Sequence, residues 1–418
     1  MYLFDVPQWV AVVIMDVWLV ATIILGFWMA WNIGANDVAN SMGTAVGAKA
    51  ITPRQAAVIA GLMNFTGAYF FGKSVTETIR KGILHQNMIS NPWIIVYGSL
   101  AALLAASIWL IFATYNGLPV STTHSIIGGI VGYGLVYAGT GIVDWGKLAQ
   151  VVLSWILSPI FGAIVAFFVF KAVRLSILTR SDPVKSARRW APFWIGLAFV
   201  VIGTMFYIKV LHGKNLFYGV LVCGVPTGIA IFGISYLLIR LHFKPSDPYI
   251  GVESIFRKVQ VVTSAYVALA HGSNDVANAV GPVAAAYAVI TMGLSGIKVP
   301  VPKWILAMGG LGIAVGIFMY GYRVMETVGK KITELTNTRG FSIDFSAATV
   351  ILVASWLGMP ISTTHTVVGA VVGVGLARGI KAINTSILKD IIISWFVTVP
   401  VAAAISAVIF KAILFLAG

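Results

Sequence analysis

Asn36-Asp37-Val38-Ala39-Asn40 recurs in the second half of the chain as Asn274-Asp275-Val276-Ala277-Asn278. Each copy follows a long apolar run with one carboxylate and two carboxamides, groups that are costly to bury in hydrocarbon. A second phrase is duplicated in the same order, as Pro119-Val120-Ser121-Thr122-Thr123-His124 and Pro360-Ile361-Ser362-Thr363-Thr364-His365. Two doubled polar motifs in an apolar chain predict one central site built from two related halves.

The composition is that of a membrane protein. The 418 residues are 59% hydrophobic and 10% charged, and the mean hydropathy of +0.94 lies far above that of soluble proteins. Crossing about 30 Å of hydrocarbon takes about 20 apolar residues. Because no Lys or Arg precedes the first apolar run and no cleavage site follows it, we interpret it as a retained span. Twelve runs lie near 10–31, 53–72, 93–115, 119–139, 147–173, 193–211, 215–240, 255–276, 303–323, 343–358, 360–377 and 389–414.

The net charge of +15 comes from basic residues scattered over short loops. This pattern excludes a nucleic-acid-binding domain and fits a positive-inside bias. With the basic loops inside, twelve crossings put both termini outside a multi-pass protein of the cell (cytoplasmic) membrane. Lys73, Arg80 and Lys81 are the exception, because this topology places them outside. Cys223 is the only cysteine, which excludes an intramolecular disulfide.

The duplicated motifs divide the chain into three parts. A first repeat occupies 1–178, a linker with two transmembrane helices occupies 179–249, and a second repeat occupies 250–418. Each repeat holds five apolar runs and two more lie between them, so equivalent segments cross in opposite directions. The sequence therefore predicts an all-α polytopic membrane protein of about 12 transmembrane segments with two inverted-topology five-segment repeats.

Runs three and four of each repeat are either two spans or one re-entrant hairpin. Asn116-Gly117-Leu118-Pro119 separates them in the first repeat, and Gly358-Met359-Pro360 separates them in the second. Gly and Pro beside buried polar residues are typical of non-helical backbone that lines a cavity. We therefore expect discontinuous or re-entrant helices here, with Ser and Thr capping the helix that follows each proline.

The Ser-Thr-Thr motifs suit an anion. A helix N-terminus offers unpaired N–H groups and about half a positive charge, and the hydroxyls add neutral donors. Two such ends that face each other would form a cage for a tetrahedral oxyanion. The candidate anion ligands are Ser121, Thr122, Thr123, Ser362, Thr363 and Thr364, together with Asn36 and Asn274.

The Asn-Asp-x-x-Asn motifs suit a small hard cation, because they supply carboxylate and carbonyl oxygens. Asp37 and Asn40 are three residues apart and therefore share one face of a helix, as do Asp275 and Asn278. A single motif of this kind is more often a helix cap, but identical duplication favours function. Two glutamates in matching places after the second run of each repeat are further candidates. The candidate cation ligands are Asp37, Asn40, Asp275, Asn278, Glu77 and Glu326.

These motifs resemble those of a known family. Gly34-Ala35-Asn36-Asp37-Val38-Ala39-Asn40-Ser41 and His271-Gly272-Ser273-Asn274-Asp275-Val276-Ala277-Asn278 are similar to the duplicated signature of the inorganic phosphate transporter family. The resemblance covers both repeats and implies phosphate uptake coupled to sodium or protons by alternating access. Ser273 departs from the Ala that the signature leads us to expect. Relatives in the same superfamily carry sulfate, so the resemblance implies the fold more strongly than the substrate.

We therefore predict a secondary active transporter, not an enzyme, that imports inorganic phosphate by sodium symport through alternating access. Sodium is the cotransported substrate, and no cofactor is expected. Cotransported cations would offset the charge of phosphate, which is about −1.5 to −2 near neutral pH. The alternatives are a proton-coupled phosphate or metal-phosphate symporter, or a sulfate transporter of the same superfamily. The sequence also leaves a homodimer open.

Overall fold

The computed structural model describes residues 8–81, 83–116, 120–242, 248–293, 299–321, 325, 335–379 and 385–417. These residues are nearly all helical, and their only β pairing is an isolated bridge between Leu84 and Val143. The predicted all-α class is therefore confirmed. Each of the twelve predicted apolar runs coincides with a helix or with a helix extended by a π-helical turn. The helices are α1 (Gln8–Gly47), α2 (Pro53–Phe71), α3 (Lys73–Lys81), α4 (Trp93–Tyr115), α5 (Thr122–Ala138), α6 (Trp145–Val173), α7 (Pro183–Lys209), α8 (Leu216–Gly219), α9 (Val225–His242), α10 (Pro248–Met292), α11 (Lys303–Gly316), α13 (Asn337–Trp356), α14 (Thr363–Arg378) and α15 (Thr385–Ala417).

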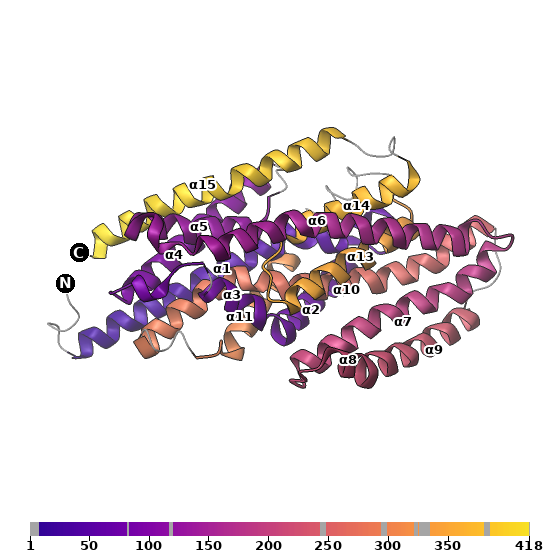
Figure 1. Ribbon diagram of the computed structural model, residues 1–418, viewed down its shortest axis with the longest axis horizontal. Helices are drawn as coiled ribbons and strands as arrows, with labels where there is room; N and C mark the ends of the chain where they lie inside the picture. The colour runs from indigo at the N-terminus through magenta and orange to yellow at the C-terminus, as the bar shows by residue number, and fades with distance from the viewer. Residues whose placement is uncertain are drawn as a thin grey trace.

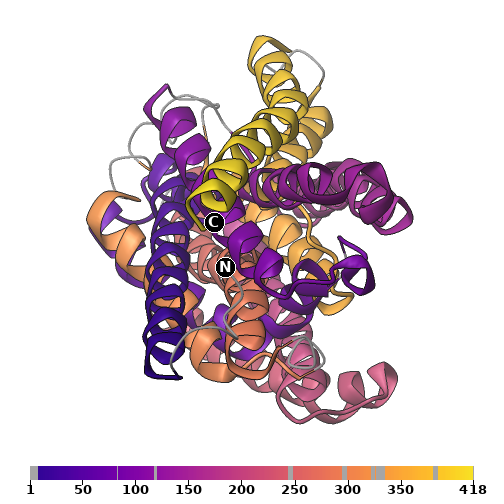
Figure 2. The same ribbon diagram turned by 90° about the vertical axis from the view of Figure 1, so that its left-hand side faces the viewer.

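The described chain contains nine helical segments that are long and apolar enough to cross a membrane. The other three predicted runs form α2, α13 and α14, which fall short of that length or hydropathy. Helix α10 is the most enclosed of the nine, with 83% of an apolar 18-residue stretch buried, whereas only 17% of such a stretch is buried in the span that contains α9. The end view in Figure 2 accordingly shows α10 surrounded by other helices. The protein is a multi-pass membrane protein with a polar centre carried on its most protected helix.

Helices α1 and α10 carry the Asn-Asp motifs along their length. They are 40 and 45 residues long, so each continues well beyond its apolar run. Asp37 and Asp275 consequently lie inside regular helix, so that each can share a helix face with the asparagine three residues later. The helix satisfies its own backbone groups, which leaves the polar side chains to find partners on other helices.

Two helix breaks occur where the sequence predicted them. Helix α4 ends before Asn116 and α5 starts at Thr122, while α13 ends at Trp356 and α14 starts at Thr363. In the second break, Gly358 has φ +70°, a left-handed conformation that favours glycine. Pro119 lies outside the described residues. Whether each helix pair spans or re-enters stays a prediction.

Equivalent helices of the two repeats make equivalent contacts. Helix α5 of the first repeat packs against α15 of the second, and α14 packs against α6 in the same way. Glycines permit both crossings, because a Cβ on Gly132 would lie 2.2 Å from Ala403 O and one on Gly373 would lie 2.1 Å from Ala163 O. Helix α15 therefore packs against the broken pair α4 and α5, and α6 packs against the broken pair α13 and α14.

The two linker helices, α7 and α9, pack against each other at the periphery (Figure 1). Helix α1 begins and α15 ends at the same end of the bundle (Figure 1). The twelve crossings that the sequence predicts would bring both ends to one side in this way. The side of the membrane on which that end lies stays a prediction.

Candidate functional site

The four sequence motifs meet in the interior of the bundle. Asn40 Nδ2 on α1 donates to Thr364 Oγ1 at 2.9 Å, which links the first repeat to the second. In the opposite sense, Asn278 Nδ2 on α10 donates to Thr122 Oγ1 and Thr123 Oγ1, each at 3.2 Å. Each Asn-Asp motif thus touches the Ser-Thr-Thr motif of the other half, and the site needs both halves.

Helices α5 and α14 both begin at this junction. Ser121 Oγ accepts the backbone N–H of His124, and Ser362 Oγ accepts that of His365, both at 3.3 Å. These bonds are helix N-caps, as the sequence predicted. Thr123 Oγ1 donates to Ile361 O at 3.0 Å, which ties the two helix starts together. The positive ends of two helix dipoles therefore lie close to one another.

The two aspartates are almost fully buried, with exposed fractions of 1% for Asp37 and 0% for Asp275. Asp37 Oδ1 accepts from Asn36 Nδ2 at 2.9 Å, and Asp275 Oδ2 accepts from Thr363 Oγ1 at 2.8 Å. Asp37 Oδ2 and Asp275 Oδ1 accept no hydrogen bond from the described residues. An unpaired buried carboxylate oxygen costs free energy, so these two atoms favour a bound cation.

The asparagines add two more unpaired oxygens, Asn278 Oδ1 and Asn274 Oδ1. Asn274 Nδ2 already donates to Ser355 Oγ and to Met359 O, both at 3.1 Å. Asn274 therefore has only an acceptor to offer, which favours a cation where the sequence predicted phosphate. Both polar atoms of the Asn36 carboxamide are already hydrogen-bonded. Its Nδ2 donates to Asp37 Oδ1, and its Oδ1 accepts from Thr114 Oγ1 at 2.7 Å.

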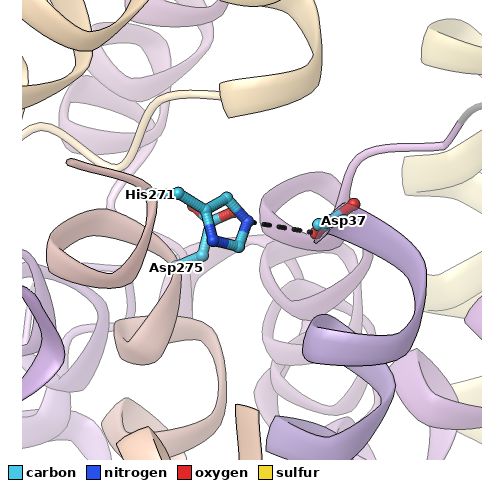
Figure 3. Close-up of side chains that lie close together, drawn as sticks. All are labelled: Asp37, His271 and Asp275. Atoms are coloured by element: carbon cyan, nitrogen blue, oxygen red, sulfur yellow. Dashed lines mark ion pairs between the residues drawn. The ribbon is translucent and has the colours of Figure 1, made fainter. Parts of the chain in front are cut away.

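Sequence reasoning missed His271 as a member of the site. This buried residue lies one turn before Asp275 on α10, with Nε2 2.9 Å from Asp275 Oδ2 and 3.9 Å from Asp37 Oδ2 (Figure 3). Its ring lies between the two carboxylates. The search for duplicated residues overlooked it because the matching position in the first copy is Ile33. The spacing of His271 and Asp275, four residues apart on one helix face, was the available signal.

The structure does not bring Glu77 into this group. Glu77 Oε2 pairs with Lys81 Nζ at 2.9 Å and with Arg80 Nη2 at 3.6 Å, and its Oε1 accepts from Val301 N at 3.2 Å. These contacts anchor α3 to the segment before α11 and give no support to a sodium-ligand role. Glu326, its predicted counterpart, lies outside the described residues.

A second buried carboxylate, also missed from the sequence, belongs to α13 and contacts α1 near the C-terminal end of that helix. Asp344 on α13 accepts from Thr44 Oγ1 at 2.6 Å and from Ser264 Oγ at 2.5 Å. Because both carboxylate oxygens accept a hydroxyl, Asp344 is a satisfied buried group that joins α1, α10 and α13. Nothing in a single unduplicated Asp on an apolar helix marked it beforehand.

A multi-pass helical bundle with a polar site shared between two repeated halves defines a membrane transporter. Residues 33–406 match the model of the phosphate transporter family, and the chain belongs to that family. Relatives named as transporters or permeases identify the chain as a transporter and not an enzyme.

Individual relatives align over most of the chain. A protein of Thermococcus kodakarensis named as a phosphate permease is 75% identical over 398 residues, which cover 95% of this chain and 98% of that protein. The chloroplastic inorganic phosphate transporter 2-1 of Arabidopsis thaliana is 43% identical, over 93% of this chain and 71% of its own length. A solved structure described as the sodium-dependent phosphate transporter superposes with a TM-score of 0.92 at 48% identity, covering 96% of this chain and 99% of the other. The family predicted from the duplicated motifs is confirmed.

Proposed function

We propose that this protein imports inorganic phosphate into the cell by sodium symport, and that alternating access exposes the site to each side in turn. One observation carries the proposal: unpaired carboxylate and carboxamide oxygens lie beside the hydroxyls and N-termini of two broken-helix pairs. Cation ligands and anion ligands are therefore parts of one site. Family membership and the sodium-dependent neighbour support the same reading.

The sodium ligands in this proposal are the oxygens that lack donors, on Asp37, Asp275, Asn274 and Asn278. All four are hard oxygen ligands, and a desolvated cation among them would remove the cost of leaving them unpaired. Asn40 supports the group from α1 through its bonds to Asp37 Oδ1 at 3.3 Å and to Thr364.

Phosphate would bind where α5 and α14 begin. The cap serines Ser121 and Ser362 keep their hydroxyl protons, because they only accept in the bonds described above. The first turns of both helices add N–H groups and dipole charge. Sodium held close by would offset the charge of phosphate, which is about −1.5 to −2 near neutral pH.

Movement of one half against the other is the second part of the proposal. Residues 1–178 and 250–418 would form inverted halves, and their matching crossings, α5 with α15 and α14 with α6, support that relation. Hydrogen bonds between the halves, such as that from Asn278 to Thr122, must change when the site opens. We place the protein in the cell membrane with both termini outside.

Labelled phosphate uptake into proteoliposomes tests this function. An inward sodium gradient should drive accumulation, an inward proton gradient alone should not, and excess sulfate should leave uptake unchanged. Uptake driven only by protons would refute sodium coupling. Strong competition by sulfate would instead refute phosphate as the specific substrate.

A further inference from the structure

The chain between α13 and α14 is bound by side chains from five other helices. Helix α13 ends in a Schellman turn, because Met359 N donates to Ala354 O at 2.9 Å and Gly358 N donates to Ser355 O at 3.1 Å. The carbonyls beyond Ser355 have no partner within α13 and need donors from elsewhere. Five of them accept from a side chain: Trp356 O from Lys209 Nζ of α7 at 3.1 Å, Gly358 O from Thr78 Oγ1 of α3 at 2.7 Å, Met359 O from Asn274 Nδ2 of α10 at 3.1 Å, Pro360 O from Trp155 Nε1 of α6 at 3.0 Å, and Ile361 O from Thr123 Oγ1 of α5 at 3.0 Å. Contacts with other helices therefore set the path of the chain into α14.

We propose that Lys209 and Thr78 are positioning residues of the phosphate site, which fix the break at 356–361 and thereby the start of α14. Neither residue belongs to the Asn-Asp or Ser-Thr-Thr motifs, and Lys209 comes from the linker between the two repeats. The inference rests on the proposed function, because that function assigns the start of α14 to phosphate. It adds a role for the linker and for α3 in setting the affinity of the site.

The ammonium group of Lys209 connects three helices. Lys209 is the last residue of α7, and its Nζ donates to Ser74 Oγ on α3 and to Trp356 O on α13. Trp356 is the last residue of α13, where the negative end of the helix dipole favours a cation. Because the lysine side chain is half-buried, water competes only weakly for these bonds. Lys209 therefore holds the beginning of the break against both α3 and α7.

Helix α3 supplies the second contact from an anchored position. Ser74 and Thr78 lie one turn apart on α3 and share the helix face that contacts the break. Glu77 of the same helix accepts from Val301 N at 3.2 Å, which binds α3 to the segment before α11. Because α3 is held in this way, the bond from Thr78 restrains Gly358 and does not simply move with it.

The break leads directly into the site. Ser362 caps α14, and Thr363 Oγ1 donates to Asp275 Oδ2 at 2.8 Å. These two residues follow Ile361 at once, so a shift of the break moves their hydroxyls. A site that is assembled for only part of the time binds its ligand more weakly, in proportion to that fraction. Loss of either contact should thus weaken phosphate binding but leave the movement of bound phosphate unimpaired.

Hydrogen–deuterium exchange of the purified protein in detergent tests the contacts in the absence of phosphate. Lys209→Met and Thr78→Val each remove one donor at nearly constant volume. In each variant the backbone amides of residues 356–366 should exchange about tenfold faster than in the wild type, because the segment opens more often. Thr78→Ser keeps a hydroxyl and should restore the wild-type rate. Unchanged exchange in either donor-free variant would overturn the proposal.

The kinetics of labelled phosphate uptake into proteoliposomes separate positioning from stability. In both donor-free variants the phosphate concentration for half-maximal uptake should rise about tenfold, which corresponds to about 1.4 kcal/mol. The maximal rate per folded protein should change by less than about twofold. A contact that only stabilised the fold would lower the maximal rate at an unchanged half-maximal concentration, and that result would overturn the proposal.

Two matched controls remove similar groups from places away from the break. Lys214→Met changes an exposed lysine just beyond α7, and Thr66→Val removes a hydroxyl that donates to Leu62 O of its own helix at 2.8 Å. Both should keep the wild-type exchange and uptake kinetics. A wild-type protein without sodium-driven uptake would refute the proposed function, whereas the exchange measurement would still decide whether Lys209 and Thr78 hold the break.

Discussion

Replacing Asp37 by Asn isolates the charge that the cation site depends on. The carboxamide retains an oxygen that can accept the bond from Asn36 Nδ2, now made to Asp37 Oδ1 at 2.9 Å. What disappears is the negative charge of a side chain that is 1% exposed and has one oxygen without a partner. The variant should therefore fold normally and lose affinity for sodium.

The size of the loss follows from the charge. Two opposite unit charges about 4 Å apart interact by about 4 kcal/mol when the effective dielectric constant is about 20. Since about 1.4 kcal/mol corresponds to a factor of ten, the sodium concentration for half-maximal uptake should rise by about a thousandfold. In practice, sodium-driven uptake would be lost at ordinary sodium concentrations.

The assay is labelled phosphate uptake into proteoliposomes over a range of external sodium concentrations. Asp16→Asn is the matched control, because Asp16 lies on the same helix but is exposed, and its uptake curve should match that of the wild type. If Asp37→Asn, eluting as a folded protein, showed wild-type sodium dependence, then the carboxylate would not be a sodium ligand.

Three further substitutions test the packing and the site. Gly272→Ala would place a Cβ 2.2 Å from Asn64 O and force α2 and α10 apart. We therefore expect thermal unfolding to show a loss of stability of about 1–3 kcal/mol. Gly43→Ala is the control, because the space around Gly43 is open, and it should leave the stability unchanged. Asn278→Ala removes a neutral oxygen ligand, so the half-saturating sodium concentration should rise, but less than when a carboxylate is lost; an unchanged value would exclude this ligand. Thr363→Val removes the hydrogen bond to the buried carboxylate of Asp275 and should lower the free energy of unfolding by about 1.5–3 kcal/mol. Unchanged thermal stability would mean that this hydroxyl does not stabilise the folded protein.

The sequence by itself determined the class of protein and the main residues of the site. Runs of about 20 apolar residues predict helices wherever they occur, because hydrocarbon leaves the backbone no other partner. Duplication then identified Asp37, Asp275 and the Ser-Thr-Thr helix starts, and the structure brings these motifs together. The helix breaks were predictable because Gly and Pro oppose continuous helix.

Only the tertiary structure decided which polar atoms remain unpaired. Asn274 and Asn36 occupy matching positions in the two motifs, yet the oxygen of Asn274 has no donor, whereas that of Asn36 accepts from Thr114. The inclusion of His271 and the exclusion of Glu77 depend in the same way on residues distant in sequence, such as Asn64 and Val301. Periodicity and duplication predict which residues share a helix face, but hydrogen bonds between helices follow from how closely the helices cross, and that is set by packing across the whole bundle.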